Sequence, residues 1–456
     1  MRNPAYQVTD PSTGAVIETF DFATDDELEE TLSASATAYA GWKNVPITER
    51  SGIVKRVATL FAERAEELAN TATQEMGKPR SEGVEEAQFC QAIFEYFATE
   101  GPSLAADQPI KTVSGGNAVV QKLPVGPLLG IMPWNFPYYQ VARFAAPNLM
   151  LGNTIVLKHA ESVPRSALAV ENIMVDAGVP TGVYQNVFAS HSHIERMLSD
   201  SRIQGVSLTG SERAGAIVAA LAGKNLKKCV LELGGSDPMV VLDTDDLDDV
   251  ADKAWDFRMY NTGQACNSNK RIIVMDALFD DFVAKLTQKA LVIDTFSPMS
   301  SRAAAESLAA QVDDAVSKGA TLHAGGFLHD GPAAFYSPAV LTGVTKDMRA
   351  YREELFGPVA VIYKVRSDEE ALALANDTQY GLGGSVFSAD AARAAKVANR
   401  LEVGMANINS TAAEGAEIPF GGVKRSGFGR ELGPLGMDEF VNKRLLYTAD
   451  APRVNP

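Results

Sequence analysis

The sequence predicts an α/β protein with two doubly wound, open parallel sheets. From about residue 126 onward, short apolar runs alternate with amphipathic helical stretches. A strand–helix–strand repeat of this kind implies parallel strands joined by crossover helices. One series of runs ends near residue 233 and a second begins at 238, so the simplest interpretation is two α/β units joined near 234–237.

The strands of both units are expected at runs of four to eight mostly apolar residues. In the first unit the runs are 128–132, 154–158, 183–188, 206–210 and 229–233. In the second unit they are 238–242, 271–275, 359–365 and 383–388.

Helices are expected in the first hundred residues. Thr24 stands three residues before Glu27, which is the spacing of a capping box at a helix start. Apolar residues then recur at helical intervals from Ile53 to Leu68, and the helix-breaking stretch GKP follows at 77–79.

Charge and composition exclude several classes of partner. The chain of 456 residues has 57 acidic and 41 basic side chains, which argues against binding to nucleic acid or an anionic membrane. No run of 18 apolar residues predicts a membrane span, and the N-terminus lacks the apolar segment of a signal peptide. The three cysteines, far apart in sequence, form no disulfide framework, so we expect a cytoplasmic protein.

No metal site is expected. His191 and His193 are close enough to form a pair, but no carboxylate motif accompanies them. We therefore expect this stretch to be a solvated loop.

Two side chains stand where an open α/β sheet builds its site. Glu232 ends an apolar run and two glycines follow it, so its carboxylate is expected at the carboxyl edge of the sheet, where a desolvated acid can act as a general base. Cys266 lies in the polar, turn-like stretch NTGQACNSN, and we expect its thiol on a loop. A lone cysteine is more often a small buried hydrophobe, and a glutamate such as Glu232 can equally be a helix cap or an ion-pair partner.

Seven stretches in order decide between these alternatives. They are MPWNFP (132–137), LKHAE (157–161), LTGSERAG (208–215), LELGG (231–235), NTGQAC (261–266), EELFGPV (353–359) and PFGGVKRSGFGRELG (419–433). Together they resemble the signature stretches of the NAD(P)-dependent aldehyde dehydrogenase superfamily over nearly the whole chain.

The resemblance implies a catalytic role for three residues. Cys266 matches the nucleophile that attacks the aldehyde carbonyl, forms a thiohemiacetal and, after hydride transfer, leaves a thioester. Glu232 matches the base for the water that hydrolyses this thioester. Asn135 matches the amide that binds the oxyanion together with the Cys266 backbone N–H. Because all three are present, a catalytically silent protein on the same fold is disfavoured.

The resemblance also implies a dinucleotide site. The matching residues are Pro133, Trp134, Lys158, Glu161, Gly210, Ser211, Gly215, Glu354 and Phe356. A carboxylate at Glu161 can accept the ribose hydroxyls but would repel a 2′-phosphate, which favours NAD+ over NADP+. Lys158 could offset the repulsion, so the expected cofactor is NAD(P)+ with a lean to NAD+.

Arg143 is the first of three residues expected to contact substrate. It lies eight residues after Asn135 on a predicted helix, where enzymes similar to succinate-semialdehyde dehydrogenase bind the distal carboxylate of the substrate with an arginine. The alternative is an exposed helix residue. Some of these enzymes have a second arginine where this chain has Tyr260.

Glu414, in the loop before PFGG, would repel a dicarboxylic semialdehyde unless it faces solvent. The chain nevertheless looks most like a bacterial branch of succinate-semialdehyde dehydrogenases, and oxidation of succinic semialdehyde is the predicted function. The same chemistry on 4-aminobutyraldehyde or a general aliphatic aldehyde stays open.

The family resemblance further implies three parts and an oligomer. The expected cofactor-binding domain is 1–107 with 126–233, and the expected catalytic domain is 234–430. Residues 108–125 and 431–456 match an oligomerisation arm and a final strand that pair between subunits. A homodimer or homotetramer follows from the resemblance alone.

Overall fold

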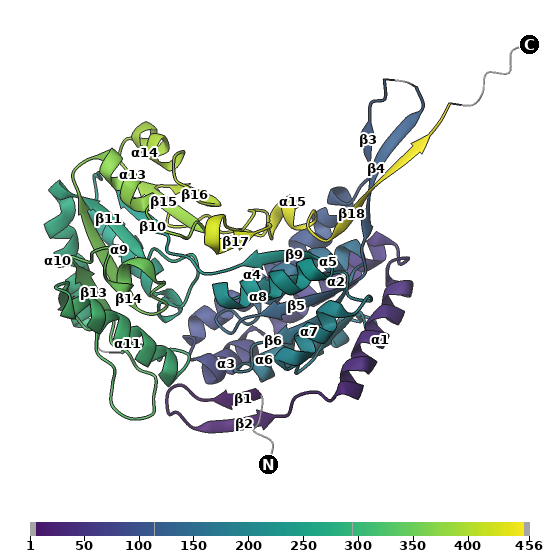
Figure 1. Cartoon of the computed structure of the whole chain (residues 1–456), viewed down its shortest axis with the longest axis horizontal. Coiled ribbons are helices and arrows are strands. Elements are labelled where there is room, and N and C mark those ends of the chain that lie inside the picture. Colours follow the sequence, from purple (N-terminus) through teal and green to yellow (C-terminus); the bar gives the residue numbers. More distant parts are fainter. Residues whose placement is uncertain (1–5, 114, 294, 451–456) are drawn as a thin grey trace, which may run out of the picture.

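The computed structural model describes residues 6–113, 115–293 and 295–450. Two parallel-sheet units lie side by side, and a narrow β-arm projects from one of them (Figure 1). The predicted α/β class with two parallel sheets is confirmed. Both sheets are covered by helices, which is why their central strands are apolar on both faces.

The first unit contains a six-stranded sheet in the order β17-β9-β8-β5-β6-β7. Its strands are β5 (Pro127–Met132), β6 (Thr154–His159), β7 (Tyr184–Asn186), β8 (Gly205–Thr209), β9 (Lys228–Glu232) and β17 (Gly427–Phe428). The five strands predicted for this unit are all present and parallel, and β17 adds an antiparallel edge. The helices between them are α5 (Tyr139–Leu151), α6 (Pro164–Asp176), α7 (His191–Ser199) and α8 (Glu212–Lys224).

The second unit contains a seven-stranded sheet in the order β12-β13-β14-β11-β10-β15-β16. Its strands are β10 (Pro238–Val241), β11 (Arg271–Met275), β12 (Thr321–Ala324), β13 (Ala339–Thr342), β14 (Val359–Val365), β15 (Gly383–Phe387) and β16 (Met405–Ile408). The helices are α9 (Leu247–Met259), α10 (Asp276–Val292), α11 (Arg302–Ser317), α12 (Arg349–Arg352), α13 (Asp368–Asn376) and α14 (Ala391–Ala398). The four predicted strands are present, and β12, β13 and β16 are additional.

The N-terminal segment forms a hairpin and four helices beside the first sheet. These elements are β1 (Tyr6–Thr9), β2 (Val16–Phe20), α1 (Asp25–Trp42), α2 (Ile47–Glu63), α3 (Ala65–Met76) and α4 (Arg80–Leu104). The capping box between Thr24 and Glu27 is confirmed at the start of α1. The helical run expected to continue to GKP is instead divided at Arg64, whose backbone leaves the helical region at φ −107°, ψ 13°.

The stretch expected to be a histidine-containing loop is helical. Ser190 caps α7, accepting a hydrogen bond from the His193 N–H at 3.3 Å, and the two histidines occupy the first turn. The prediction of a solvated loop was therefore wrong, because the cap and the buried residues Ile194 and Leu198 favour a helix.

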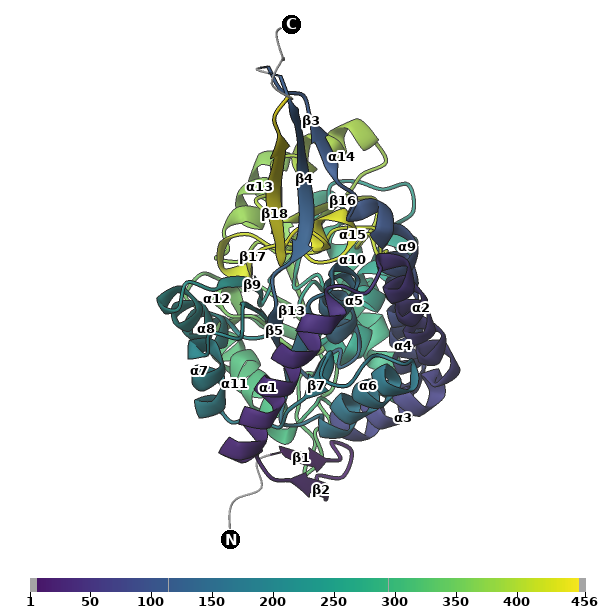
Figure 2. The ribbon, with the colours of Figure 1, turned by 90° about the vertical axis from the view of Figure 1, so that its right-hand side faces the viewer.

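The arm is a three-stranded antiparallel sheet, β3 (Gln108–Ile110), β4 (Asn117–Pro124) and β18 (Val441–Thr448), in the order β18-β4-β3. It extends away from both sheets (Figures 1 and 2). Leu445, Leu446 and Tyr447 on β18 are 61%, 47% and 48% exposed. The outer strand therefore presents apolar side chains, and its outer edge pairs with no other strand among the described residues.

The division into domains with boundaries at 107, 126, 233 and 430 stays a prediction. The first sheet takes its strands from 127–232 together with 427–428, and the second takes its strands from 238–408. Among the described residues, no helix is both long and apolar enough to span a membrane.

Candidate active site

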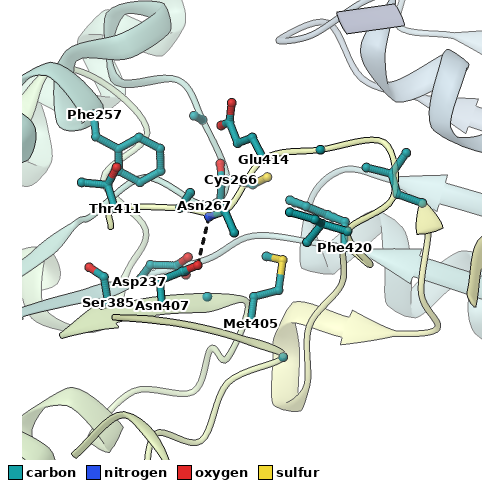
Figure 3. Close-up of a pocket in the computed structure, with 18 of the residues that line it drawn as sticks. Asp237, Phe257, Cys266, Asn267, Ser385, Met405, Asn407, Thr411, Glu414 and Phe420 are labelled. Atoms are coloured by element: carbon teal, nitrogen blue, oxygen red, sulfur yellow. Dashed lines mark hydrogen bonds between the residues drawn. The ribbon is translucent and has the colours of Figure 1, made fainter. Parts of the chain in front are cut away.

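A cavity of about 660 Å³ opens between the two units. Residues of the turn before α5, the Cys266 loop and the segment after β16 line it, and Figure 3 shows Cys266 among these side chains with Asp237, Asn407 and Phe420. A cavity of this size suits a small ligand. Glu232 stands at the carboxyl end of β9, the edge at which open α/β sheets place their sites. The second sheet borders the cavity at the amino ends of its strands instead, with Pro238 of β10, Gly383 of β15 and Met405 of β16.

Cys266 lies on a loop, as predicted, between the turn η1 (Tyr260–Gly263) and β11. Asn261 and Thr262 in this turn have left-handed φ values of 51° and 54°, which are costly for residues other than glycine. The Asn261 N–H donates to Glu82 Oε2 at 2.7 Å, and its Nδ2 donates to the Asn135 carbonyl at 2.8 Å. These contacts hold the strained turn and set the position of the cysteine loop.

Asn135 is fixed to the same loop through its side chain. Its Nδ2 donates to the Gln264 carbonyl at 3.0 Å, and the residue is 5% exposed. A primary amide has two N–H donors, so this bond orients the group and leaves a second donor for an oxyanion. Gln264 is itself held, because its Oε1 accepts from the Ser300 N–H at 2.9 Å.

The thiol of Cys266 lies among both cationic and acidic side chains. Burial raises its pKa to about 11; the cations Arg143 and Lys270 oppose that shift, and the acids Glu354 and Asp237 add to it. Formation of the thiolate therefore needs further positive charge near the sulfur, of the kind a cationic cofactor ring supplies.

Glu232 ends β9 and is 2% exposed. Neither carboxylate oxygen has a hydrogen-bond partner among the described residues. Burial raises the pKa of Glu232 well above its usual range, with Arg143 opposing the shift. A β-carbon at Gly421 would lie 2.7 Å from Glu232 Oε1, so the carboxyl group packs directly against the Gly421 backbone.

Arg143 lies on α5 inside the cavity wall and is fully buried. Its Nε is paired with Glu431 Oε2, and its Nη2 donates to Thr209 Oγ1 at 3.3 Å. The guanidinium also lies over the Phe420 and Tyr139 rings, 4.4 and 4.9 Å from their centroids.

Arg143 does not line the cavity. A direct contact with a substrate carboxylate would require the guanidinium to leave Glu431. The structure therefore does not place Arg143 where the carboxylate clamp was expected, and that role stays a prediction.

Tyr260 and Glu414 line the cavity, and their contact with substrate stays a prediction. The Tyr260 ring stacks on Phe136 with centroids 6.0 Å apart. Glu414 is exposed at the mouth. Glu86 also reaches this wall, but Lys78 Nζ pairs with it at 2.7 Å and offsets its charge.

The residues expected near the nicotinamide form one cluster. Pro133 and Trp134 follow β5, and the Trp134 ring meets Phe356 edge to face with centroids 5.8 Å apart. Glu354 accepts from the Gly235 N–H at 3.0 Å and pairs with Lys270 Nζ at 3.1 Å. A side chain at Gly234 would meet Glu354 Oε2 at 2.5 Å, so glycine permits this close approach.

The turn from β8 into α8 suits a pyrophosphate. Ser211 caps α8, accepting from the Ala214 N–H at 3.3 Å, and the Gly210 N–H donates to the Glu232 carbonyl at 3.0 Å. Gly215 lets the helix pack against Leu233, since a β-carbon there would lie 2.7 Å from that side chain. The free N–H groups of a helix start favour an anion, so these residues fit a dinucleotide.

Lys158 and Glu161 come together at the end of β6. Lys158 Nζ lies 2.6 Å from Glu161 Oε1, the lysine side chain is 6% exposed and the glutamate 40%. The expectation of NAD+ rested on the negative charge of Glu161. The ammonium group of Lys158 offsets that charge.

Sequence reasoning missed two buried charged residues at this site. Lys270 follows Cys266 by four residues and is buried, but the polar residues around it, Asn267 to Arg271, gave no signal that distinguishes it from a solvated lysine. Glu431 lies in the stretch 419–433, and the family resemblance implied no role for it. Within the described ranges, no three histidine, cysteine or acidic side chains are grouped to hold a metal.

Comparison with known proteins identifies the family of this chain. The aldehyde dehydrogenase family model matches residues 2–446. The chain is 51% identical to a succinate-semialdehyde dehydrogenase [NADP(+)] of Deinococcus radiodurans, covering 97% of this chain and 94% of that one. A Mycobacterium avium protein of the same name is 40% identical, covering 96% and 95%.

A solved structure has the same fold over nearly the whole chain. The succinic semialdehyde dehydrogenase of Streptococcus pyogenes, in complex with NADP+ as the cofactor, superimposes with a TM-score of 0.95 at 41% identity, covering 98% of this chain and 100% of that one. Because the family model matches nearly the whole chain and a relative is 51% identical over almost its full length, the chain belongs to the aldehyde dehydrogenase family.

Proposed function

We propose that this protein oxidises succinic semialdehyde to succinate and reduces NADP+ or NAD+. The main observation in support of this function is that Cys266 lines the cavity. The Asn135 amide is hydrogen-bonded to the loop that carries Cys266. The substrate follows from the relatives named for succinate-semialdehyde oxidation, which match almost the full length of the chain. They favour succinic semialdehyde over 4-aminobutyraldehyde or a general aliphatic aldehyde.

The first step is attack of Cys266 Sγ on the aldehyde carbon. The oxygen that gains charge is stabilised by Asn135 Nδ2–H and the Cys266 backbone N–H, and loss of one such donor typically costs ~2.7–4 kcal/mol of transition-state stabilisation. A bound nicotinamide would supply the acceptor for the hydride from the substrate carbon. Trp134, Phe356 and Glu354 would hold its ring and ribose.

Glu232 removes a proton from the water that hydrolyses the thioester. It must itself be deprotonated for this step, and burial works against that state. The Arg143 charge opposes the burial effect on both Glu232 and Cys266. We therefore propose that Arg143, from its position in the cavity wall, favours the deprotonated forms of both side chains through its positive charge.

We propose NADP+ as the preferred cofactor. Its 2′-phosphate requires a cation, and the Lys158 ammonium beside Glu161 is one. The relatives are named for NADP+, and the Streptococcus pyogenes structure contains it. The earlier lean to NAD+ is not supported by these observations.

We further propose a cytoplasmic homodimer or homotetramer that pairs through β18. Within the described ranges, the outer edge of this strand pairs with no other strand, and Leu445, Leu446 and Tyr447 on it are exposed. Light scattering after gel filtration distinguishes an oligomer from a monomer, and Leu446→Asp is expected to shift an oligomer toward smaller species.

The test of the function is kcat/KM for succinic semialdehyde, butyraldehyde and 4-aminobutyraldehyde with each dinucleotide. We expect succinic semialdehyde to be preferred at least ten-fold, or ~1.4 kcal/mol. A preference for either other aldehyde would overturn the substrate assignment while leaving the chemistry at Cys266 intact.

A further inference from the structure

Lys270 is a buried cation between the nucleophile loop and the cofactor residues. Its side chain is 1% exposed. Its Nζ donates to the carbonyl oxygens of Ala265 at 2.7 Å and Cys266 at 2.8 Å, and lies 3.1 Å from Glu354 Oε1. An ammonium group has three donors, so these contacts match its full capacity.

The contact with Ala265 has a geometric consequence for the oxyanion site. The Ala265 carbonyl and the Cys266 N–H belong to one planar, trans peptide group, in which the oxygen and the hydrogen point in opposite directions. Holding the oxygen against Lys270 therefore directs the Cys266 N–H away from the lysine. A cation on the carbonyl also polarises the peptide and makes its N–H a stronger donor.

The second contact fixes the other side of the cysteine. Because Lys270 also binds the Cys266 carbonyl, both peptide groups that flank the nucleophile are held by one ammonium. A β-carbon at Gly235 would overlap with the Cys266 carbonyl, so the Gly234–Gly235 segment packs directly beneath this loop. The backbone around the thiol therefore has little freedom to turn.

The third contact joins this loop to the cofactor residues. Glu354, which would hold the nicotinamide ribose, accepts from Lys270 and from the Gly235 N–H. Lys270 Nζ also lies 5.8 Å from the centroid of the Phe356 ring. One side chain thus contacts both the nucleophile loop and the cofactor residues.

We propose that Lys270 is a positioning residue that orients the Cys266 N–H for the oxyanion and couples this orientation to Glu354. The proposal rests on the proposed function only in that Cys266 is the nucleophile. It does not depend on which aldehyde or which dinucleotide is used. The competing explanation is that Lys270 merely satisfies two buried carbonyls and stabilises the loop.

Cleavage of 4-nitrophenyl acetate without cofactor separates these explanations, because the ester needs Cys266 and the oxyanion donors but neither hydride transfer nor an aldehyde. The variants are Lys270→Met, which removes the charge and the donors, and Lys270→Gln, which keeps one donor group. Lys253→Met is the matched control, since Lys253 lies on the surface of α9, 47% exposed and paired with Asp249. Cys266→Ala gives the background rate.

We expect Lys270→Met to slow ester cleavage roughly 10- to 100-fold, less than outright loss of an oxyanion donor, because the donor remains but is misdirected. Lys270→Gln should fall between this variant and the wild type. We also expect the dinucleotide Kd, measured by quenching of protein fluorescence, to rise for both variants because Glu354 loses its partner. Lys253→Met should match the wild type in both measurements.

A structural role alone predicts a lower melting temperature with an unchanged ester-cleavage rate per folded molecule. If folded Lys270→Met cleaves the ester within two-fold of the wild type, the proposal is overturned. Should neither variant fold, Lys270→Arg keeps the charge, but its planar guanidinium does not reproduce the three contacts of the ammonium, so slower ester cleavage and a higher dinucleotide Kd are expected. If both values are unchanged, the proposal is overturned. A wild type that cleaves the ester but oxidises no succinic semialdehyde would instead refute the proposed function and leave this test valid.

Discussion

Arg143 is paired with Glu431 inside the wall of the cavity, and neither side chain is exposed by more than 6%. Glu431 is fixed in turn, because its Oε1 accepts from Ser207 Oγ at 3.0 Å and its backbone pairs with Phe420. The pair lies behind the residues that line the cavity. From there its charge acts on Glu232 and Cys266.

Replacement of Arg143 by Met is expected to lower kcat/KM by similar factors for succinic semialdehyde and for butyraldehyde, because the lost charge acts on the catalytic groups. Loss of one partner also leaves Glu431 buried and unpaired, which should lower the free energy of unfolding by ~3–5 kcal/mol. Removing both charges in Arg143→Met/Glu431→Gln should recover part of this stability. A loss confined to succinic semialdehyde would mean that the guanidinium reaches the substrate carboxylate.

The rate of thioester hydrolysis is expected to rise as the pH increases above the usual titration range of a glutamate. Burial raises the pKa of Glu232, and only the deprotonated carboxylate can accept a proton from water, so a larger fraction becomes active as the pH increases. In Glu232→Gln this dependence should disappear, and reduced cofactor should appear as a burst followed by a slow steady state. Stopped-flow absorbance over a pH series measures both, and an unchanged steady-state rate would exclude Glu232 as the base.

Replacement of Glu161 by Gln is expected to increase the preference for NADP+ over NAD+. The change frees the Lys158 ammonium for a 2′-phosphate and removes a carboxylate that would repel it. We expect roughly a ten-fold increase in the ratio of kcat/KM values, since the half-exposed charge is partly screened by salt. Lys158→Met should shift the ratio in the opposite direction. Unchanged ratios in both variants would place the 2′-phosphate elsewhere.

The sequence predicts which strand or loop carries each site residue better than it predicts which charged side chains pair with one another. The end of β9 at Glu232 follows from an apolar run and two glycines, and the loop position of Cys266 follows from its polar neighbours. Both signals are local, so they can be read from a few adjacent residues.

The partners of Arg143 depend instead on tertiary packing. Helical periodicity places Arg143 toward the cavity, but Glu431 is contributed by a segment that returns to the first sheet only after the whole second sheet has been completed. The strand β17 lies in the same returning segment. With only two residues, it is too short to show an alternation of apolar and polar side chains. Long-range pairing of this kind cannot be inferred from spacing along the chain.

The most direct test of the account is to trap the acyl intermediate on Glu232→Gln. The protein is mixed with succinic semialdehyde and NADP+, quenched in acid during the burst, and digested for mass spectrometry. We expect one succinyl group on the peptide that contains Cys266, and none in Cys266→Ala/Glu232→Gln. A succinyl group on another residue, or reduced cofactor formed in a burst without any adduct, would contradict the assignment of Cys266 as the nucleophile.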